Sequence, residues 1–415
     1  MNGKPSSNSD WRPEMNGHMI DEVKSYCYLG VIISSNGSFS TAVNSLYRKG
    51  RGGYFSLRST VARLFIKAKC LDKLFNTLIE PILTYGCQVW FPTMSIAKNL
   101  VCNFRHDGML NLSSIAKMPL EQVHLRHLKF LLGINRRSSN CAAWGETGSR
   151  PLLMNCLKLS IKFLNRAMSL PASSLVKAAL TEQIQLNLTW YDNMKSILEC
   201  FGWVTPSQYQ RNTSSILNAG LLLDLSPVAA IEQKVEEAFI ASWRTSVNSS
   251  SKLSFYSTVN NEFTWEAHLD HARSFRDRRA TSQIRCSSHK MNVESGRYKH
   301  LNRSERTCGH CSSLGVPNPP IEDENHVLHS CPLAADLREQ FVIKYKKLTL
   351  KKPSTNFAGI YLEDAPSKGG RNSPTRQMLS REEMLSIHLS TRLMNNIYSM
   401  MLRRKKELKI NPESN

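Results

Sequence analysis

The chain has 415 residues, of which 41% are hydrophobic and 21% charged, as is typical of a folded protein of several compact units. Its charge is unbalanced, because 54 Lys and Arg residues face 33 Asp and Glu residues, a formal net charge of +21. This excess favours a polyanionic partner, RNA or DNA, because neutralised phosphates release condensed counterions. The alternative is a basic surface that serves only solubility.

No stretch reaches the ~18 uninterrupted apolar residues that a membrane span requires, and the polar N-terminus lacks the apolar segment of a secretory signal. Several of the 11 cysteines, such as Cys70, Cys87 and Cys156, lie within apolar patterns and not in a disulfide framework. We therefore expect an intracellular protein, nuclear or cytoplasmic, with reduced thiols. We expect no membrane partner and no small-molecule substrate.

The first part of the chain combines a polar start with strand and helix signals. Residues 1–20 are expected to form a disordered leader. Residues 23–34 are expected to form a strand, because β-branched and aromatic residues there precede an Asn-Gly turn. Residues 38–65 are expected to be helical, with an interruption at the Gly-Arg-Gly-Gly segment of residues 50–53.

Helical periodicity is clearest after residue 70. An apolar stripe of period 3.6 over residues 71–82 predicts a helix that kinks near Glu80, because Pro81 lies inside the stripe. A further helix over residues 120–132 is expected to end at Gly133. Other helices are expected to begin at Pro151 and to cover 228–243 and 381–408, with polar linkers at 205–216, 245–258 and 364–380.

Two stretches are strongly basic. Residues 39–71 contain no acidic residue, and residues 271–306 contain few, with Trp265, Phe275 and Tyr298 available for base stacking. We predict phosphate contacts here, although a merely solvated helix face is the alternative. The predicted contact residues are Arg48, Lys49, Arg51, Arg58, Arg63, Lys67 and Lys69 in the first stretch, and Arg276, Arg278, Arg279, Arg285 and Arg297 in the second.

A metal-ligand spacing follows the second basic stretch. Cys308 and Cys311, then His326 and Cys331, have the spacing C-x2-C-x14-H-x4-C, which suits a tetrahedral Zn²⁺ ion. The loop between the pairs has little to bury, so a structural metal would stabilise it. A chance cluster is the alternative.

His310 and His329 compete for the third position of this spacing. We prefer His326, because His329 is only two residues from Cys331 and the two ligands would then need a tighter geometry. Four protein ligands leave no open coordination position, which indicates a structural and not a hydrolytic ion.

Catalytic signatures are missing from the sequence. It has no Asp-Asp pair of the kind that two-metal polymerases use and no phosphate-binding glycine loop. The acidic segment 322–324 is expected to cap the helix that carries His326. His124 and His127 are expected to be satisfied surface histidines. We therefore expect no enzyme, and a mainly α fold in which a helical bundle follows a short N-terminal β element, with a small zinc-stabilised module near the C-terminus.

Several segments in order resemble the C-terminal portion of the reverse transcriptase of non-LTR (LINE-type) retrotransposons. The similarity covers roughly residues 22–345, and its most specific parts are Pro-Ile-Leu-Thr-Tyr-Gly-Cys-Gln-Val-Trp and the Cys-Cys-His-Cys block. The matching segments are 28–33, 36–39, 78–90, 129–133, 144–148, 284–289, 294–298 and 308–332.

The resemblance implies a domain order and a partner. It makes the zinc module one that helps to hold template RNA or target DNA. The expected parts are a leader at 1–20, a thumb-like helical region at 21–115, a helical connector at 116–250, a basic helical segment at 251–306, the CCHC zinc module at 307–345, a linker at 346–380 and an amphipathic helix at 381–408.

The fingers and palm of that family, with the catalytic aspartates, do not precede the thumb-like region here. We therefore expect a nucleic-acid-binding remnant: a truncated or degenerate element, or a gene model that covers only its 3′ end. The alternatives are a host-adopted protein-interaction module that uses the zinc site and the C-terminal helix, and an accessory part of an active reverse transcriptase with a separate palm.

Overall fold

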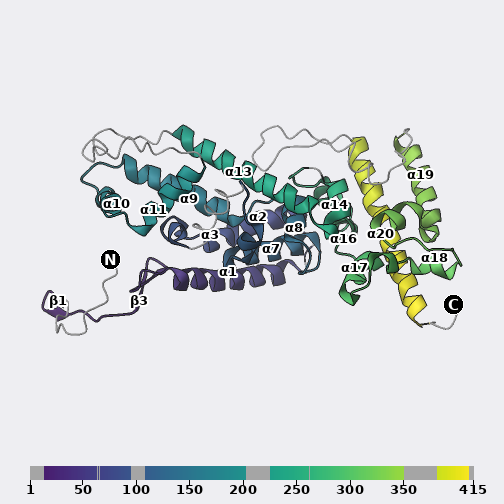
Figure 1. Ribbon diagram of the computed structural model, residues 1–415, viewed down its shortest axis with the longest axis horizontal. Coiled ribbons are helices and arrows are strands. Elements are labelled where there is room, and N and C mark those ends of the chain that lie inside the picture. The colour runs from purple at the N-terminus through teal and green to yellow at the C-terminus, as the bar shows by residue number, and fades with distance from the viewer. Residues whose placement is uncertain are drawn as a thin grey trace.

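The computed structural model describes residues 14–62, 64, 66–94, 108–201, 225–260, 262–349 and 381–410. The fold is mainly helical with short N-terminal strands and a Cys/His cluster toward the C-terminus, as the sequence predicts. The molecule is elongated, with the N-terminal hairpins at one end and helices α18 (Gly309–Ser313), α19 (Ala335–Thr349) and α20 (Arg381–Ile410) at the other (Figure 1). The predicted linkers at 205–216 and 364–380, and Arg63, lie outside the described residues.

Two short hairpins begin the described chain. The expectation of a disordered leader is wrong for the first hairpin, β1 (Glu14–Met15) with β2 (His18–Met19). The single strand expected over 23–34 is also wrong, because β3 (Ser25–Tyr28) pairs antiparallel with β4 (Val31–Ser34). Leu29 and Gly30 turn the chain with φ angles of 46° and 83°. The Tyr85 hydroxyl donates to the Leu29 carbonyl at 2.8 Å and so ties the second hairpin to the helices.

Helix α1 (Ser40–Val61) runs without a break through the glycines at which an interruption was predicted. Two of these glycines serve a close helix contact, because a Cβ on Gly50 would lie 2.3 Å from Cδ2 of Leu83, a fully buried residue of α3 (Glu80–Leu83). A Cβ on Gly53 would lie 3.3 Å from Ile79. The expectation therefore failed because tertiary packing outweighs the low helix propensity of glycine.

We expect Gly50→Ala to lower the free energy of unfolding by about 1–3 kcal/mol, because the added methyl group overpacks the contact with buried Leu83. Gly52 is the matched control: it lies in the same helix, and a Cβ placed on it would have no neighbouring atom within 4 Å. Gly52→Ala should raise the stability by up to ~1 kcal/mol. Urea denaturation of the two variants measures the difference, and equal effects would contradict the close contact.

Helices α1 to α13 enclose the first hydrophobic core, which includes Phe75, Trp90, Trp144 and Trp243. The predicted kink is confirmed, because α2 ends at Leu78 and α3 starts at Glu80. Gly133 ends α7 with a φ of 68°, also as predicted. The remaining elements are α2 (Ala68–Leu78), α4 (Cys87–Trp90), η1 (Phe91–Thr93), α6 (Leu112–Lys117), α7 (Pro119–Leu132), α8 (Asn140–Glu146), α9 (Leu152–Ser169), α10 (Leu175–Gln185), α11 (Thr189–Cys200) and α13 (Leu225–Asn248).

A second core joins α14, α16, the Cys/His region, α19 and α20. The linker expected over 245–258 is wrong, because Leu253, Phe255 and Tyr256 are buried there. Helix α19 likewise continues to Thr349, inside the expected linker. The elements are η3 (Ser251–Leu253), α14 (Ser254–Val259), α15 (Ala267–His271), α16 (Phe275–Arg285), α17 (Asn292–Ser295), η4 (Arg297–Lys299), η5 (Arg303–Glu305), α18 (Gly309–Ser313), η6 (His326–Ser330), η7 (Pro332–Ala334), α19 (Ala335–Thr349) and α20 (Arg381–Ile410).

Candidate functional site

The four residues of the predicted zinc spacing lie together in a buried cluster. Their ligand atoms all lie within 4.8 Å of one another, and the members are Cys308, Cys311, His326 and Cys331. The Sγ atoms of Cys308 and Cys331 are 3.9 Å apart, too far for a disulfide, and Sγ of Cys311 lies 3.4 Å from Nε2 of His326. A tetrahedron around an ion with ~2.3 Å bonds to sulfur and ~2.0 Å bonds to nitrogen has edges of about 3.5–3.8 Å. The cluster could therefore hold a metal ion.

Local backbone structure places these ligands. Cys308 immediately precedes α18, and its N–H donates to the Pro320 carbonyl at 2.8 Å, which closes the intervening loop. Asp323 Oδ1 accepts the N–H of His326 at 2.9 Å, where the π-helical turn η6 begins. Nδ1 of His326 lies 3.1 Å from Ser330 Oγ, which leaves Nε2 directed at the thiols.

The cluster includes His326 and neither of the two competing histidines, His310 in α18 and His329 in η6. Two of its thiols, Cys308 and Cys331, are in hydrogen-bonding contact. A hydrogen bond with Cys331 lowers the pKa of the Cys308 thiol, and the same contact raises the pKa of Cys331. A cation among the three sulfur atoms would favour the thiolate form of each.

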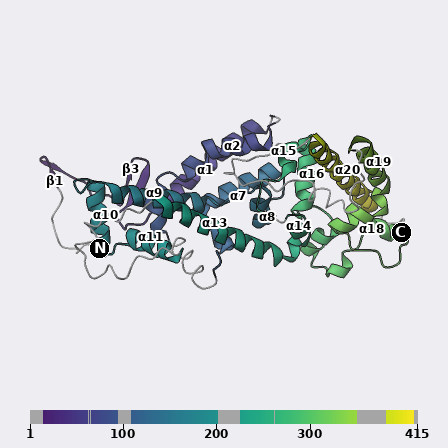
Figure 2. The same cartoon turned by 90° about the horizontal axis from the view of Figure 1, so that it is seen from above.

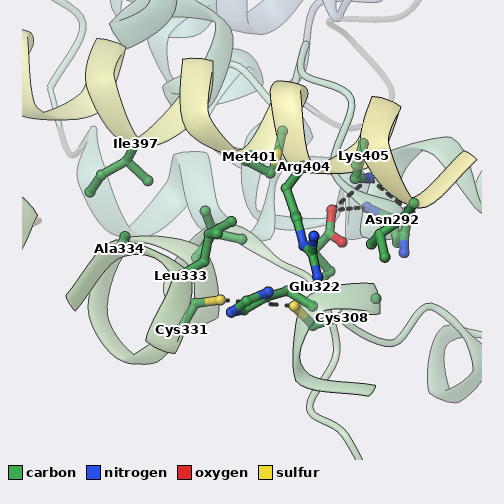
Figure 3. Close-up of a pocket in the computed structure, with 14 residues that line it drawn as sticks. Asn292, Cys308, Glu322, Cys331, Leu333, Ala334, Ile397, Met401, Arg404 and Lys405 are labelled. Carbon is green, nitrogen blue, oxygen red and sulfur yellow. Dashed lines mark hydrogen bonds and ion pairs between the residues drawn. The ribbon is translucent and has the colours of Figure 1, made fainter. Parts of the chain in front are cut away.

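Helix α20 covers the cluster. Figure 3 shows Arg404 and Lys405 extending from α20 toward Cys308 and Glu322. Lys405 Nζ lies 2.6 Å from Glu322 Oε1 and donates to the Lys290 carbonyl at 2.7 Å. Cys308, Glu322, Arg404 and Lys405 border a cavity of about 150 Å³ between α20 and the cluster. The basic end of α20 is thus partly committed to contacts within the chain.

Each of the three residues in the acidic segment 322–324 contacts a different part of the chain. Asp323 caps the turn that carries His326, as predicted for the segment, while Glu322 pairs with Lys405. Glu324 Oε1 lies 2.8 Å from His289 Nε2. Burial raises the pKa of Glu324, but its contact with His289 and its other hydrogen bonds together lower it.

The first basic stretch presents its side chains to solvent. Arg48, Lys49, Arg51, Arg58, Lys67 and Lys69 are all exposed. Two of these arginines lie over aromatic rings: the Arg51 guanidinium is 5.6 Å from the centroid of Phe55, and the Arg58 guanidinium is 4.7 Å from that of Phe130. Helix α1 therefore carries cations together with an exposed ring.

Helix α7 adds Arg126 and the turn after it adds Arg136, two cations that were not predicted from the sequence. Arg126 lies over the same Phe55 ring at 5.4 Å. Burial, followed by the charges of Arg136 and Arg51, lowers the pKa of Arg126, so these guanidinium groups repel one another. Figure 2 shows α1 beside α7. We call the following residues the α1–α7 patch: Arg51, Phe55, Arg58, Arg126, Phe130 and Arg136.

Among the described residues, none of the four arginines of this patch forms an ion pair with a carboxylate. The sequence signal for Arg126 and Arg136 was weak, because each lies in a short segment without a basic run. Only the packing of α7 against α1 brings Arg126 to the Phe55 ring beside Arg51, and Arg136 lies near Arg126. The arrangement leaves positive charge without a counterion partner inside the described chain.

The second basic stretch is divided between surface and interior. Arg276 and Arg279 are exposed, and the Arg279 side chain packs over Gly133, so this stretch reaches the end of α7. Arg297 is half-buried and pairs with Glu294 at 2.9 Å.

Two of the predicted phosphate contacts in this stretch are wrong. Arg278 is 8% exposed and lies over the Phe275 ring at 5.2 Å. Arg285 is 2% exposed. Neither guanidinium can reach a phosphate on the surface.

Arg285 is the centre of a buried ion network. Its Nε lies 2.6 Å from Glu146 Oε1, and its Nη2 lies 2.8 Å from Glu266 Oε2. Burial opposes the charge of Arg285, but Glu146 and Glu266 raise the pKa of its guanidinium. His268, 3.5 Å from the Glu146 carboxylate, has its pKa lowered by burial and by Arg285, which keeps it neutral. The network joins α8 to α15 and α16.

The prediction that His124 and His127 lie on the surface is wrong, because these side chains are 2% and 0% exposed. Nδ1 of His124 lies 2.9 Å from Glu121 Oε1, which also accepts the indole N–H of Trp144 at 2.9 Å. His127 stacks on Phe75 with 4.3 Å between ring centroids. Both therefore belong to the first core.

Comparison of the chain with family models, curated proteins and solved structures found no match. Within the described ranges, no helix combines the length and the hydropathy needed to cross a membrane.

Proposed function

We propose that this protein binds nucleic acid through the α1–α7 patch. The observation that carries the proposal is the gathering of three arginines over two aromatic rings, with Arg136 beside Arg126, and with no carboxylate partner for the four among the described residues. Arginine suits phosphate because its planar fork donates two parallel hydrogen bonds, and the net charge of +21 supplies long-range attraction.

We propose further that the Cys/His cluster holds one structural Zn²⁺. Three sulfur donors and one imidazole nitrogen are the ligands that zinc prefers, and four of them complete its tetrahedron. The ion would fasten α18 to η6 beneath α20. Its proposed role is to stabilise this end of the molecule, with no part in chemistry.

The resemblance to the C-terminal portion of LINE-type reverse transcriptases remains our proposal for the origin of the chain. The order of its motifs in the sequence supports it, and we propose no catalytic centre in the chain. Protein interaction through α20 is the weaker candidate, because Leu393, Met394, Ile397 and Met401 on that helix are buried in the second core.

A charge-matched pair of variants tests the proposed surface. Arg51→Gln/Arg126→Gln removes two charges from the patch, and Lys162→Gln/Arg166→Gln removes two exposed charges from α9. We expect the patch variant to weaken binding of RNA or DNA by about tenfold or more, since hydrogen bonds to charged groups contribute about 1.5–3 kcal/mol each. Fluorescence anisotropy at one fixed salt concentration measures this. Equal losses in both variants would contradict binding at the patch.

A further inference from the structure

Phe55 is an aromatic ring that the fold leaves open to solvent. It is 39% exposed on α1, while the ring of the preceding residue, Tyr54, is 1% exposed and inside the first core. Arg51 and Arg126 both approach the Phe55 ring, at 5.6 Å and 5.4 Å from its centroid. The ring therefore has cations beside it and an accessible apolar surface.

The spacing along α1 places the ring within a row of charges. Arg51, Phe55 and Arg58 stand at positions i, i+4 and i+7, so they share one face of the helix. Arg58 continues this row to Phe130 of α7. The face thus alternates groups that suit phosphate with groups that suit a flat apolar partner.

The two forms of nucleic acid would use this face differently. A duplex presents phosphates on its outside and keeps its base faces stacked within, so it can contact the arginines but gives Phe55 no partner. A single strand exposes base faces, and stacking a base on an aromatic side chain contributes about 1–3 kcal/mol. Guanidinium groups also stack on bases while they neutralise the backbone.

We infer that the α1–α7 patch binds single-stranded RNA or DNA, with a base stacked on Phe55 and the adjoining phosphates at Arg51 and Arg126. This inference rests on the proposed function and adds the form of the polymer to it. The stacking base displaces a guanidinium group from the ring, and that guanidinium group then donates hydrogen bonds to the phosphate.

The test compares Phe55→Leu with Phe55→Tyr in the full-length, zinc-loaded chain. Leucine retains an apolar side chain without a π face, and tyrosine retains the ring, so the two variants separate stacking from apolar burial. The probes are fluorescein-labelled oligo(U), oligo(dT) and a mixed-sequence DNA duplex, each of about 15 nucleotides or base pairs, within the range of single-strand binding sites. Thermal unfolding of both variants checks that the fold is kept.

We expect Phe55→Leu to weaken binding of the single strands about tenfold, Phe55→Tyr to bind as the wild type does, and duplex affinity to be unchanged in both. Equal wild-type affinity for single strand and duplex, with no loss in Phe55→Leu, would overturn this inference. If Arg51→Gln/Arg126→Gln still weakened both polymers in that case, the proposed function would stand. Failure of the wild type to bind any of the three probes would overturn both.

Discussion

Replacement of Arg285 by methionine is expected to lower the free energy of unfolding by about 3–5 kcal/mol, because the substitution leaves the carboxylate of Glu146 charged and unpaired in the interior. Glu146 is 0% exposed, and its Oε1 atom lies 2.6 Å from Arg285 Nε. Urea denaturation measures the effect.

Two controls separate this mechanism from a general loss of positive charge. Arg276, on the same helix, is exposed, so Arg276→Ala should change the stability by less than about 0.5 kcal/mol. The double variant Arg285→Met/Glu146→Gln removes the uncompensated charge and should be more stable than the sum of the two single effects predicts. Equal losses in Arg285→Met and Arg276→Ala would contradict the role assigned to the network.

Loss of a proposed zinc ligand is expected to have the second large effect. Cys311→Ser should reduce the metal content from one zinc ion per chain to nearly none and make residues 307–331 sensitive to protease, because metal-binding free energies of about 10–16 kcal/mol act as folding energy in small zinc modules. Chelation of the wild-type protein should have the same effect on proteolysis.

Three histidines of this region provide matched variants that test the zinc prediction. His326→Ala should lose the metal, whereas His310→Ala and His329→Ala should retain it, because only His326 contributes a ring nitrogen to the cluster. Elemental analysis of the purified variants gives the zinc content directly. Retention of zinc by His326→Ala together with its loss from His329→Ala would contradict the assigned ligand set.

Features set by local chemistry could be predicted from the sequence. Pro81 breaks the helix on which it lies because its ring excludes the regular hydrogen bond, and Gly133 ends α7 because it tolerates a positive φ. The four-residue Cys/His cluster was predictable for a similar reason, since close Cys and His spacings limit how the chain can arrange these side chains.

Features set by distant partners could not be predicted. The glycines of α1 were interpreted as an interruption, but Gly50 makes room for Leu83, which is 33 residues away in the sequence. Arg285 was assigned to phosphate because its neighbours in sequence are basic, whereas its counterions come from α8 and from Glu266, just before α15. Arg126 joined the patch only through the packing of α7 on α1. Charge runs along a sequence therefore mix surface contacts with interior ion pairs.

The salt dependence of binding tests the central claim most directly. If the four arginines of the α1–α7 patch neutralise phosphates of a single strand, the slope of log affinity against log salt concentration should be about −3 or steeper, since each neutralised phosphate contributes about −0.7. Arg51→Gln/Arg126→Gln should make the slope less steep by about 1.4, while Lys162→Gln/Arg166→Gln should leave it unchanged. A flat wild-type slope, or the same slope in both variants, would contradict nucleic-acid binding at this surface.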